Sequence, residues 1–472
     1  MKKNMKTKYL LYALALVLLP SMMVSCGDDE ADIDGNPTEN PGDNSGKTDL
    51  EAANEEWSPE KQQQYLEDVA LEMNRKVRVD DFRNYVDLAN YVNERYIEDS
   101  DWDNVENWAD DIMDGLMGDI VNIKTESDAW SKYVYNCYKS TILASNFKGQ
   151  WTAHNGKWNY ADADDLQFIF NNQKGEQCVL KLATSGKVVK THLFDVDDWK
   201  RYEWDESTYT YTEYYDRTQY TIGVPEKIEV TLTESGTTLI SNTITIDLTS
   251  LSGEKFDLSK SRFSFASTTK FNNGYTIKTE NVKYSAASAS AKASVLKNNE
   301  TLITVTFSSD LKNIPAKTLT DWYDMDGDEI EDVLSNTNAQ NGIFALDFLG
   351  KVQVKGTIKD LHGLIDDMDD ADDNQENEEA YKRAIKRANT RYEAFVYYNG
   401  GNFKQAWLSL EPFKDYEWSY SGQTYVEWGV EPIINFANGA SYSFDEYFTE
   451  DAFKDLIDAF EYQEDTAEDM WN

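Results

Sequence analysis

The chain has 472 residues, with 45 Lys and Arg against 86 Asp and Glu, so its formal net charge is −41. Such a charge repels the phosphates of nucleic acids and anionic membrane surfaces, which excludes nucleic acid as a partner. Hydrophobic residues make up 40% of the chain. We therefore expect a folded protein of two or three domains with sizeable cores.

A basic and then apolar segment opens the chain. Lysines at positions 2, 3, 6 and 8 precede the apolar run 10–19. This run is shorter than the roughly 20 residues that a membrane-spanning helix needs, and its flanks are typical of a secretory signal peptide. The sequence predicts that residues 1–25 are a signal peptide.

The signal is followed by Ser25-Cys26 and then by the acidic run Gly27-Asp28-Asp29-Glu30. The first pair resembles the bacterial lipobox, although Met23 stands where that motif usually has leucine, and the acidic run resembles the export signal of Bacteroidetes surface lipoproteins. The resemblance implies diacylglycerol and palmitate chains on Cys26, which would anchor the protein to the outer membrane, facing outward. It transfers no catalytic residue. An ordinary secreted protein with a cysteine near the cleavage site is the alternative.

The next two segments differ sharply in composition. Residues 26–50 are polar and acidic, which is typical of a disordered tether. Residues 51–146 are expected to be helical, because Ser58 can cap a helix that Pro59 begins. Apolar spacing predicts further helices over 82–97, 102–117 and 129–143.

Residues 147–358 change to the alternating pattern of strands, which predicts an antiparallel β-rich domain. Two stretches, Glu234–Leu248 and Lys297–Leu311, match each other at a constant offset and indicate repeated hairpins. We expect a fainter third copy at Cys178–Val196, with Ser185-Gly186 as its turn.

The remaining chain is divided into an acidic tract and a mixed end. Residues 359–391 are predicted to be a loop or a solvated helix, and residues 392–472 to be strands plus a C-terminal helix that packs on the β domain. The expected fold is therefore α+β: a helical N-terminal region, a large antiparallel β-sheet built from repeated hairpins, and a C-terminal helix.

An acidic segment with carboxylates at alternating positions is a candidate calcium site. Its ligands would be Asp324, Asp326, Asp328 and Asp332, because Ca²⁺ takes six to eight oxygen ligands. The segment resembles dockerin and EF-hand loops, but its glycine and its twelfth position depart from them. The alternative is a solvated acidic turn with no cofactor.

Two aromatic patches are candidate glycan platforms, because sugar rings stack on aromatic side chains and hydrogen-bond to carboxylates. The alternative is that these aromatics simply favour strands. The candidate residues are Trp199, Trp204, Tyr209 and Tyr211 in the first patch and Trp407, Trp418 and Trp428 in the second.

Two further features are candidate modification sites. Cys137 and Cys178 could form a disulfide in an exported protein or stay as free thiols. Asp465-Thr466-Ala467 resembles Bacteroidetes O-glycosylation sites, which makes Thr466 a candidate acceptor.

The chain lacks the common catalytic motifs, including Gly-x-Ser-x-Gly and His-Glu-x-x-His. We therefore expect a non-catalytic binding or structural role at the cell surface, with a glycan or an envelope protein as partner. The alternatives are a glycan-binding protein that accompanies an outer-membrane transporter and a carrier of a lipid or apolar ligand beside the small-faced strand Ala287–Val295. A glycoside hydrolase comes last, because no carboxylate pair stands out.

Overall fold

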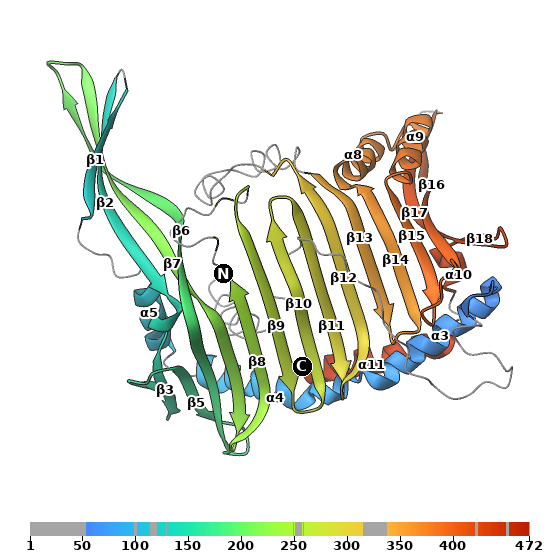
Figure 1. Ribbon diagram of the computed structural model, residues 1–472, viewed down its shortest axis with the longest axis horizontal. Coiled ribbons are helices and arrows are strands. Elements are labelled where there is room, and N and C mark those ends of the chain that lie inside the picture. Colours follow the sequence, from blue (N-terminus) through green and yellow to red (C-terminus); the bar gives the residue numbers. More distant parts are fainter. Residues whose placement is uncertain are drawn as a thin grey trace. The chain divides into compact units, whose positions relative to one another are not determined.

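A computed structural model describes residues 53–98, 102–113, 120–128, 130–248, 250, 257, 259–314, 338–420, 423–449 and 453–471. It confirms the predicted α+β class: a large mixed sheet, a helical region near the N-terminus and a C-terminal helix. The chain divides into two compact units, and Figure 1 labels their helices and strands. Unit 1 holds Leu88–Asn272. Unit 2 holds Asn273–Asn313 and the described parts of Met23–Asp87 and Ser335–Asn472.

Unit 1 contains short helices and nine strands in its described part. They are the second half of α4 (Arg83–Val92), η3 (Asn93–Glu98), α5 (Asp103–Met113), β1 (Asn122–Ser127), β2 (Ser131–Leu143), η4 (Ala144–Asn146), β3 (Gly149–His154), β4 (Lys157–Ala161), β5 (Leu166–Asn171), β6 (Gln177–Asp205), β7 (Thr210–Glu234), β8 (Thr237–Asp247) and β9 (Arg262–Phe271). Leu88, Val92 and Val105 from the helices pack with Trp151, Trp158 and Phe170 from the strands. Burial of these large side chains attaches the helices to β3–β6.

Strand β7 organises unit 1. It pairs with β6 along most of its length, and on its other side it pairs with β2 over its first half and with β8 over its second. The β2–β7 pairing is parallel. The predicted helix over 129–143 is therefore wrong, because Tyr133, Tyr135 and Cys137 alternate along a strand and a partner far away in sequence stabilises it.

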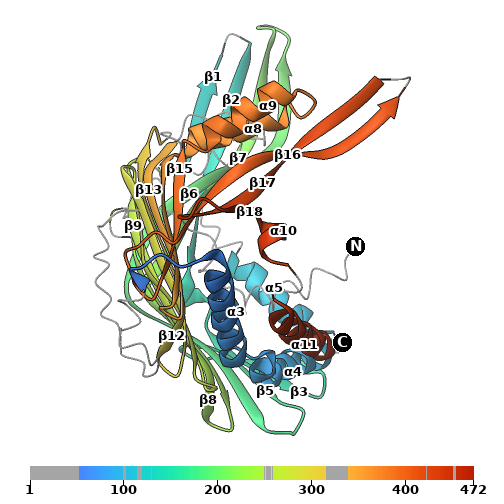
Figure 2. The same ribbon diagram turned by 90° about the vertical axis from the view of Figure 1, so that its right-hand side faces the viewer.

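Unit 2 is an antiparallel series of strands in chain order with helices around it (Figure 2). Its elements are α3 (Pro59–Lys76), η2 (Val79–Phe82), the first half of α4, β10 (Tyr275–Ser285), β11 (Ser288–Lys297), β12 (Glu300–Lys312), β13 (Asn338–Phe348), β14 (Val352–Asp360), α8 (Leu361–Asp372), α9 (Glu378–Ala388), β15 (Tyr392–Tyr398), β16 (Ala406–Tyr420), β17 (Gln423–Phe436), β18 (Ser441–Ser443), α10 (Phe444–Tyr447) and α11 (Lys454–Trp471).

Helix α3 begins as predicted, with Ser58 accepting a hydrogen bond from the backbone of Lys61 and Pro59 in the first turn. The fully buried side-chain amides of Gln62 and Gln405 stabilise the N-terminal end of this helix. Gln405 donates to the backbone ahead of the helix, and Gln62 donates to the carbonyl of Gln405 and accepts from the Tyr398 hydroxyl. Because each buried amide is hydrogen-bonded, burial of these polar groups does not leave an unsatisfied partner.

The repeated hairpins are confirmed at two of the three predicted copies. The first passes from β7 to β8 through Ser235-Gly236, and the second from β11 to β12 through Asn298-Asn299, and all four turn residues have positive φ. Such angles are typical of two-residue hairpin turns. The third copy is wrong, because β6 continues through Ser185-Gly186, with a bulge at Gly186-Lys187 between the pairs Ser185–Lys227 and Val188–Pro225.

The acidic tract 359–391 forms two helices, α8 and α9, rather than a loop. Asp367 on α8 is 4% exposed and accepts hydrogen bonds from Arg387 and Arg391 at 2.6 and 2.9 Å. Burial alone would raise the pKa of Asp367, but the two guanidinium groups outweigh it and lower the pKa. The basic end of the tract therefore neutralises its acidic beginning and joins the two helices.

Candidate functional site

Strands β1, β2, β7 and β6 of unit 1 lie side by side as a four-stranded ribbon. Side chains of directly paired residues point to the same face of a sheet. The registers therefore place seven aromatic residues on one face, which we call the aromatic face: Tyr133, Tyr135, Trp199, Tyr202, Trp204, Tyr211 and Tyr215.

A bulge brings the two tryptophans to this face. Trp199 pairs with Tyr215, while Arg201 pairs with Tyr214, so Lys200 is an extra residue on β6. The extra residue shifts the alternation by one position. Without it, strict alternation would put Trp199 and Trp204 on opposite faces.

The rings of the aromatic face contact one another. The centroids of Trp204 and Tyr211 lie 4.6 Å apart, and those of Tyr135 and Tyr215 are stacked at 5.4 Å. Tyr209 lies at the tip, with its ring 6.1 Å from that of Trp204. These contacts hold the rings in fixed relative positions. Preorganised rings lose less conformational entropy when a ligand binds than mobile exposed side chains do.

Carboxylates and one arginine lie among the rings. Glu213 accepts a 2.6 Å hydrogen bond from Tyr215, and this bond, together with burial, raises the pKa of Tyr215 to about 12. Arg217 lies over the ring of Tyr135 and donates two hydrogen bonds to Asp197, at 2.6 and 2.5 Å. The face thus offers carboxylate acceptors beside aromatic surface.

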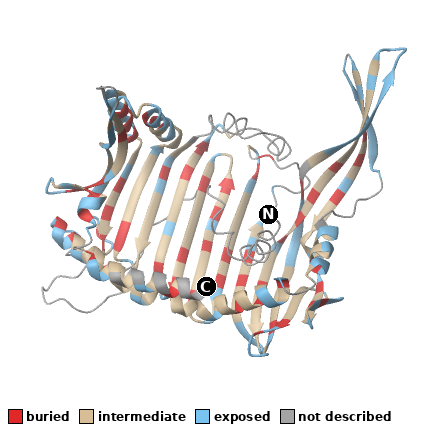
Figure 3. Cartoon of the chain, turned by 180° about the vertical axis from the view of Figure 1, so that it is seen from behind, coloured by how far each residue is buried: buried red, intermediate tan, exposed pale blue. Residues whose placement is uncertain are grey.

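Four of the seven rings keep large parts in contact with solvent, whereas Tyr135 is buried. Trp199 is 52% exposed, Tyr202 62%, Trp204 43% and Tyr211 46%, and the outer part of the ribbon is among the most exposed parts of unit 1 (Figure 3). Single exposed apolar residues are ordinary, but a contiguous aromatic patch on a folded surface marks an interaction site.

The outer edge of β6 is protected against pairing with another strand. In the described part of the chain no strand pairs with this edge beyond Leu182. Three bulges interrupt the edge, after Ser185, His192 and Trp199, and many of its side chains are charged. Bulges and charges are the usual protection of free edges, which leaves the aromatic face as the candidate binding surface of the ribbon.

The second predicted patch lies on the β16–β17 hairpin of unit 2, and the structure divides it. Trp418 is stacked between Tyr416 and Tyr425, with centroids 5.6 and 5.4 Å away. Trp407 is 39% exposed and lies farther along β16, whereas Trp428 is 8% exposed and packs against α9. Trp428 therefore belongs to a core.

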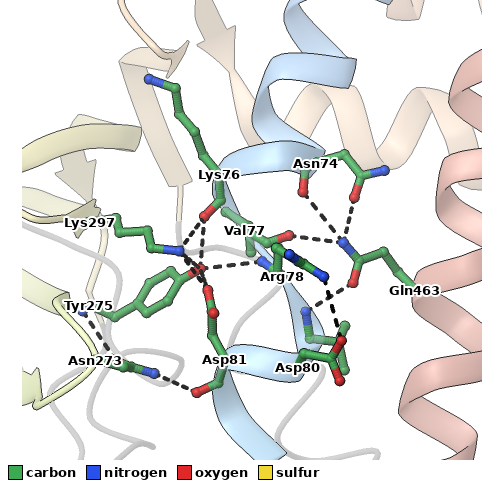
Figure 4. Close-up of polar contacts among 11 residues, drawn as sticks. Asn74, Lys76, Val77, Arg78, Asp80, Asp81, Asn273, Tyr275, Lys297 and Gln463 are labelled. Carbon is green, nitrogen blue, oxygen red and sulfur yellow. Dashed lines mark hydrogen bonds and ion pairs between the residues drawn. The ribbon is translucent and has the colours of Figure 1, made fainter.

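The densest described polar cluster joins α3 and η2 to β10 and β11 within unit 2 (Figure 4). Lys297 donates to the Lys76 carbonyl at 2.9 Å and to Asp81 at 2.6 Å, and the hydroxyl of the buried Tyr275 lies 2.9 Å from each of these acceptors, within donating distance of either. Burial would raise the pKa of Asp81, but these two donors lower it. A cation at the C-terminal end of α3 complements the helix dipole, so we interpret the cluster as structural.

Of the two alternatives for Cys137 and Cys178, a disulfide or free thiols, the structure shows free thiols, and both are buried. In the strand register Cys137 lies opposite Arg217 and Cys178 lies opposite Glu234, so the two cysteines neighbour distant points of β7. With about 3.3 Å per strand residue, the two cysteines are far beyond the roughly 4.4–6.8 Å between Cα atoms that a disulfide requires. Burial raises the pKa of Cys178 to about 11, which makes this thiol unreactive.

The predicted O-glycosylation at Thr466 is contradicted by its position inside α11. Its side chain is 8% exposed, and its hydroxyl donates to the Tyr462 carbonyl at 2.7 Å. An acceptor hydroxyl must be accessible. The calcium candidates Asp324, Asp326, Asp328 and Asp332 and the lipidation candidate Cys26 lie outside the described residues.

The small-faced strand proposed beside an apolar ligand is β11. Ala289 is fully buried, but Ser294 and Leu296, which have the opposite parity, are also buried. Both faces of β11 therefore carry packed residues, and the alanine side is not distinguished as the wall of a ligand site.

Sequence reasoning nominated Trp199, Trp204, Tyr209 and Tyr211, and the structure brings them together at the ribbon. It missed Tyr133 and Tyr135, because they were assigned to a helix. The alternation of Tyr133, Tyr135 and Cys137 was the signal that could have revealed this strand.

No family model, curated protein or solved structure matches the chain. Among the described residues, no helix combines the length and the apolar character needed to cross a membrane. Within the same residues, no group of three or more His, Cys, Asp and Glu side chains is arranged to hold a metal ion.

Proposed function

We propose that the protein is a lipid-anchored, outward-facing outer-membrane lipoprotein that binds carbohydrate through the aromatic face of unit 1 without chemical turnover. One observation carries this proposal: four aromatic residues nominated from sequence converge on one exposed ribbon, joined by four more (Tyr133, Tyr135, Tyr202 and Tyr215), with carboxylates between them. Sugars present apolar ring faces and hydroxyl donors, which match aromatic rings and carboxylate acceptors respectively.

The charge of the chain supports a carbohydrate over other exposed-surface ligands. At a net charge of −41, the field disfavours anionic lipid surfaces and nucleic acids. Insertion of the ribbon tip into a lipid bilayer would also bury the carboxylates of Asp128, Glu203 and Asp205, which is energetically unfavourable. Neutral hydroxyl-rich ligands meet neither obstacle.

The binding test uses the full chain with Cys26→Ser, which removes the proposed lipid attachment and keeps every described residue. We expect retention of this protein on a soluble-glycan panel and quenching of tryptophan fluorescence, with no product on chromatography. Trp204→Ala should lower the affinity at least about tenfold, equal to about 1.4 kcal/mol. Absence of binding to every glycan, or release of product, would contradict the proposal.

A matched control separates the ribbon from general loss of an exposed aromatic side chain. Tyr462 on α11 is 58% exposed, comparable to Tyr202 at 62%. Tyr462→Ala should leave glycan affinity unchanged, whereas Tyr202→Ala should weaken it. Equal loss in both variants would indicate that the ribbon is not the binding surface.

The proposed anchor has its own test. The wild-type chain should sediment with membranes and be cleaved by protease added to intact cells, and Cys26→Ser should release it into the soluble fraction. If both forms fractionate alike, Cys26 is not the anchor. This result would not affect the carbohydrate proposal, which the glycan panel tests independently.

A further inference from the structure

The aromatic face is divided into rungs by its strand registers, each rung being a row of paired residues across the ribbon. The first rung holds Trp204 and Tyr211; the second holds Tyr202, Glu213, Tyr133 and Glu126; the third holds Trp199, Tyr215, Tyr135 and Lys124; the fourth holds Asp197, Arg217, Cys137 and Asn122. Aromatic rings therefore occupy three consecutive rungs, and the Arg217–Asp197 ion pair ends the row.

The rungs set the length of a ligand that uses the whole face. Consecutive rungs are two residues apart along β7, or about 6.6 Å, so the first and third are about 13 Å apart; on β6 the extra residue Lys200 lies between the second and third rungs. One six-membered ring can lie on each rung. A single sugar would cover one rung only and leave most of the exposed aromatic surface in water, whereas a linear chain can follow β6 across all three.

The charges of the face indicate what kind of chain fits. Asp197 is neutralised by Arg217, and Glu213 already accepts from Tyr215 but keeps further lone pairs for a second donor. Glu126 is directly opposite Tyr133 at the far side of the second rung. The second rung thus presents carboxylates to hydroxyl donors, and an anionic chain would meet them as like charges.

We propose, on the basis of the carbohydrate function above, that the ligand is an uncharged linear oligosaccharide or polysaccharide of at least three sugar rings. It lies along β6 with one ring on each aromatic rung. Trp204 and Trp199 carry the outer rings, and Tyr202 carries the middle ring beside Glu213, which accepts hydrogen bonds from its hydroxyl groups.

The test is a chain-length series measured by calorimetry on the full chain with Cys26→Ser. The probes are neutral gluco-, xylo- and mannooligosaccharides of one to six rings, together with oligouronates of the same lengths. We expect affinity for one neutral series to rise about tenfold with each ring up to three and then to level off, and the oligouronates to bind at least about tenfold more weakly.

Two variants locate the rungs. Trp199→Ala and Trp204→Ala remove opposite ends of the row, so each should move the plateau from three rings to two and leave the affinity for a two-ring ligand within about twofold. Tyr462→Ala should leave the whole series unchanged. Unchanged thermal unfolding in each variant confirms that the ribbon is folded.

The possible failures are distinguishable. Equal affinity for one ring and for six would overturn the rung arrangement while leaving carbohydrate binding intact. Preference for oligouronates would overturn the uncharged ligand. Absence of binding to any member of any series would overturn the carbohydrate function itself.

Discussion

The ribbon of unit 1 and the β16–β17 hairpin of unit 2 are both rich in aromatic and acidic residues, but their aromatic side chains have different surroundings. Both combine tryptophan, tyrosine and acidic residues on long antiparallel strands. In the hairpin, Leu410, Val426, Trp428 and Val430 form one face, and the helices α8 and α9 cover it. In the ribbon, Trp199, Tyr202, Trp204 and Tyr211 on the aromatic face remain exposed, although Tyr135 beside them is as buried as Trp428.

The difference lies in what packs on each face, not in the composition of the strands. One face of the hairpin packs in a core, and on the other face Tyr416, Trp418 and Tyr425 stack while Trp407 lies farther along β16. The ribbon gains width from β2, whose parallel pairing adds Tyr133 and Tyr135 beside β7. An aromatic cluster in a sequence therefore indicates a binding face only when no other element of the fold packs over it.

The largest expected effect is on stability, and it separates the two regions. Trp428→Ala removes a buried ring from under α9, so we expect the free energy of unfolding to fall by about 3–5 kcal/mol. Trp204→Ala, which truncates an exposed ring, should cost less than about 1 kcal/mol. Urea unfolding measures both. Similar losses in the two variants would mean that the ribbon rings are also core residues.

A second test disrupts the helical cover directly. Asp367→Asn leaves Arg387 and Arg391 without their shared buried carboxylate, so we expect a loss of about 2–3 kcal/mol, reduced from the fully buried case because the arginines are partly exposed. Arg383→Ala, at an exposed ion pair with Glu379, is the matched control and should cost less than about 1 kcal/mol.

The pH dependence of the same site has a definite sign. The folded-state pKa of Asp367 is lowered, so its stabilisation is fully present above the unfolded value of about 3.9 and is lost as pH falls through the lower folded value. Wild type and Asp367→Asn should therefore differ most above pH 4 and converge in stronger acid. A difference that persisted unchanged at low pH would contradict this origin.

Local patterns in the sequence predicted the elements whose partners are close in the chain. The α3 cap at Ser58 and Pro59 and the hairpins within Glu234–Leu248 and Lys297–Leu311 follow from adjacent residues. The local patterns gave the wrong secondary structure where pairing with a distant strand determines it. The β2–β7 pairing makes 131–143 a strand, and β7 keeps β6 extended through Ser185-Gly186.

The candidate site shows the same limit at the level of single residues. Composition nominated Trp199 and Trp204, but their common face depends on the bulge at Lys200, which only the pairing with β7 reveals. Trp428 was nominated on equal grounds, and the cover of α9 makes it a core residue. The register between two strands and the packing of a helix on a strand depend on residues far apart in the sequence, so the residue spacing within one strand cannot predict them.

The smallest expected effect lies within the ribbon. Tyr215→Phe removes the hydroxyl that donates to Glu213 and keeps the ring that stacks on Tyr135, so the free energy of unfolding should fall by about 0.5–1.5 kcal/mol. Glu213 raises the pKa of Tyr215 to about 12. The contribution is therefore fully present below the unfolded tyrosine value of about 10 and is lost as pH rises from there towards 12. The tyrosinate absorbance of wild type minus that of Tyr215→Phe should show one late-titrating group. A difference curve centred near pH 10 would show that Glu213 does not control this hydroxyl, and that the ribbon carboxylate is already free to accept from a ligand.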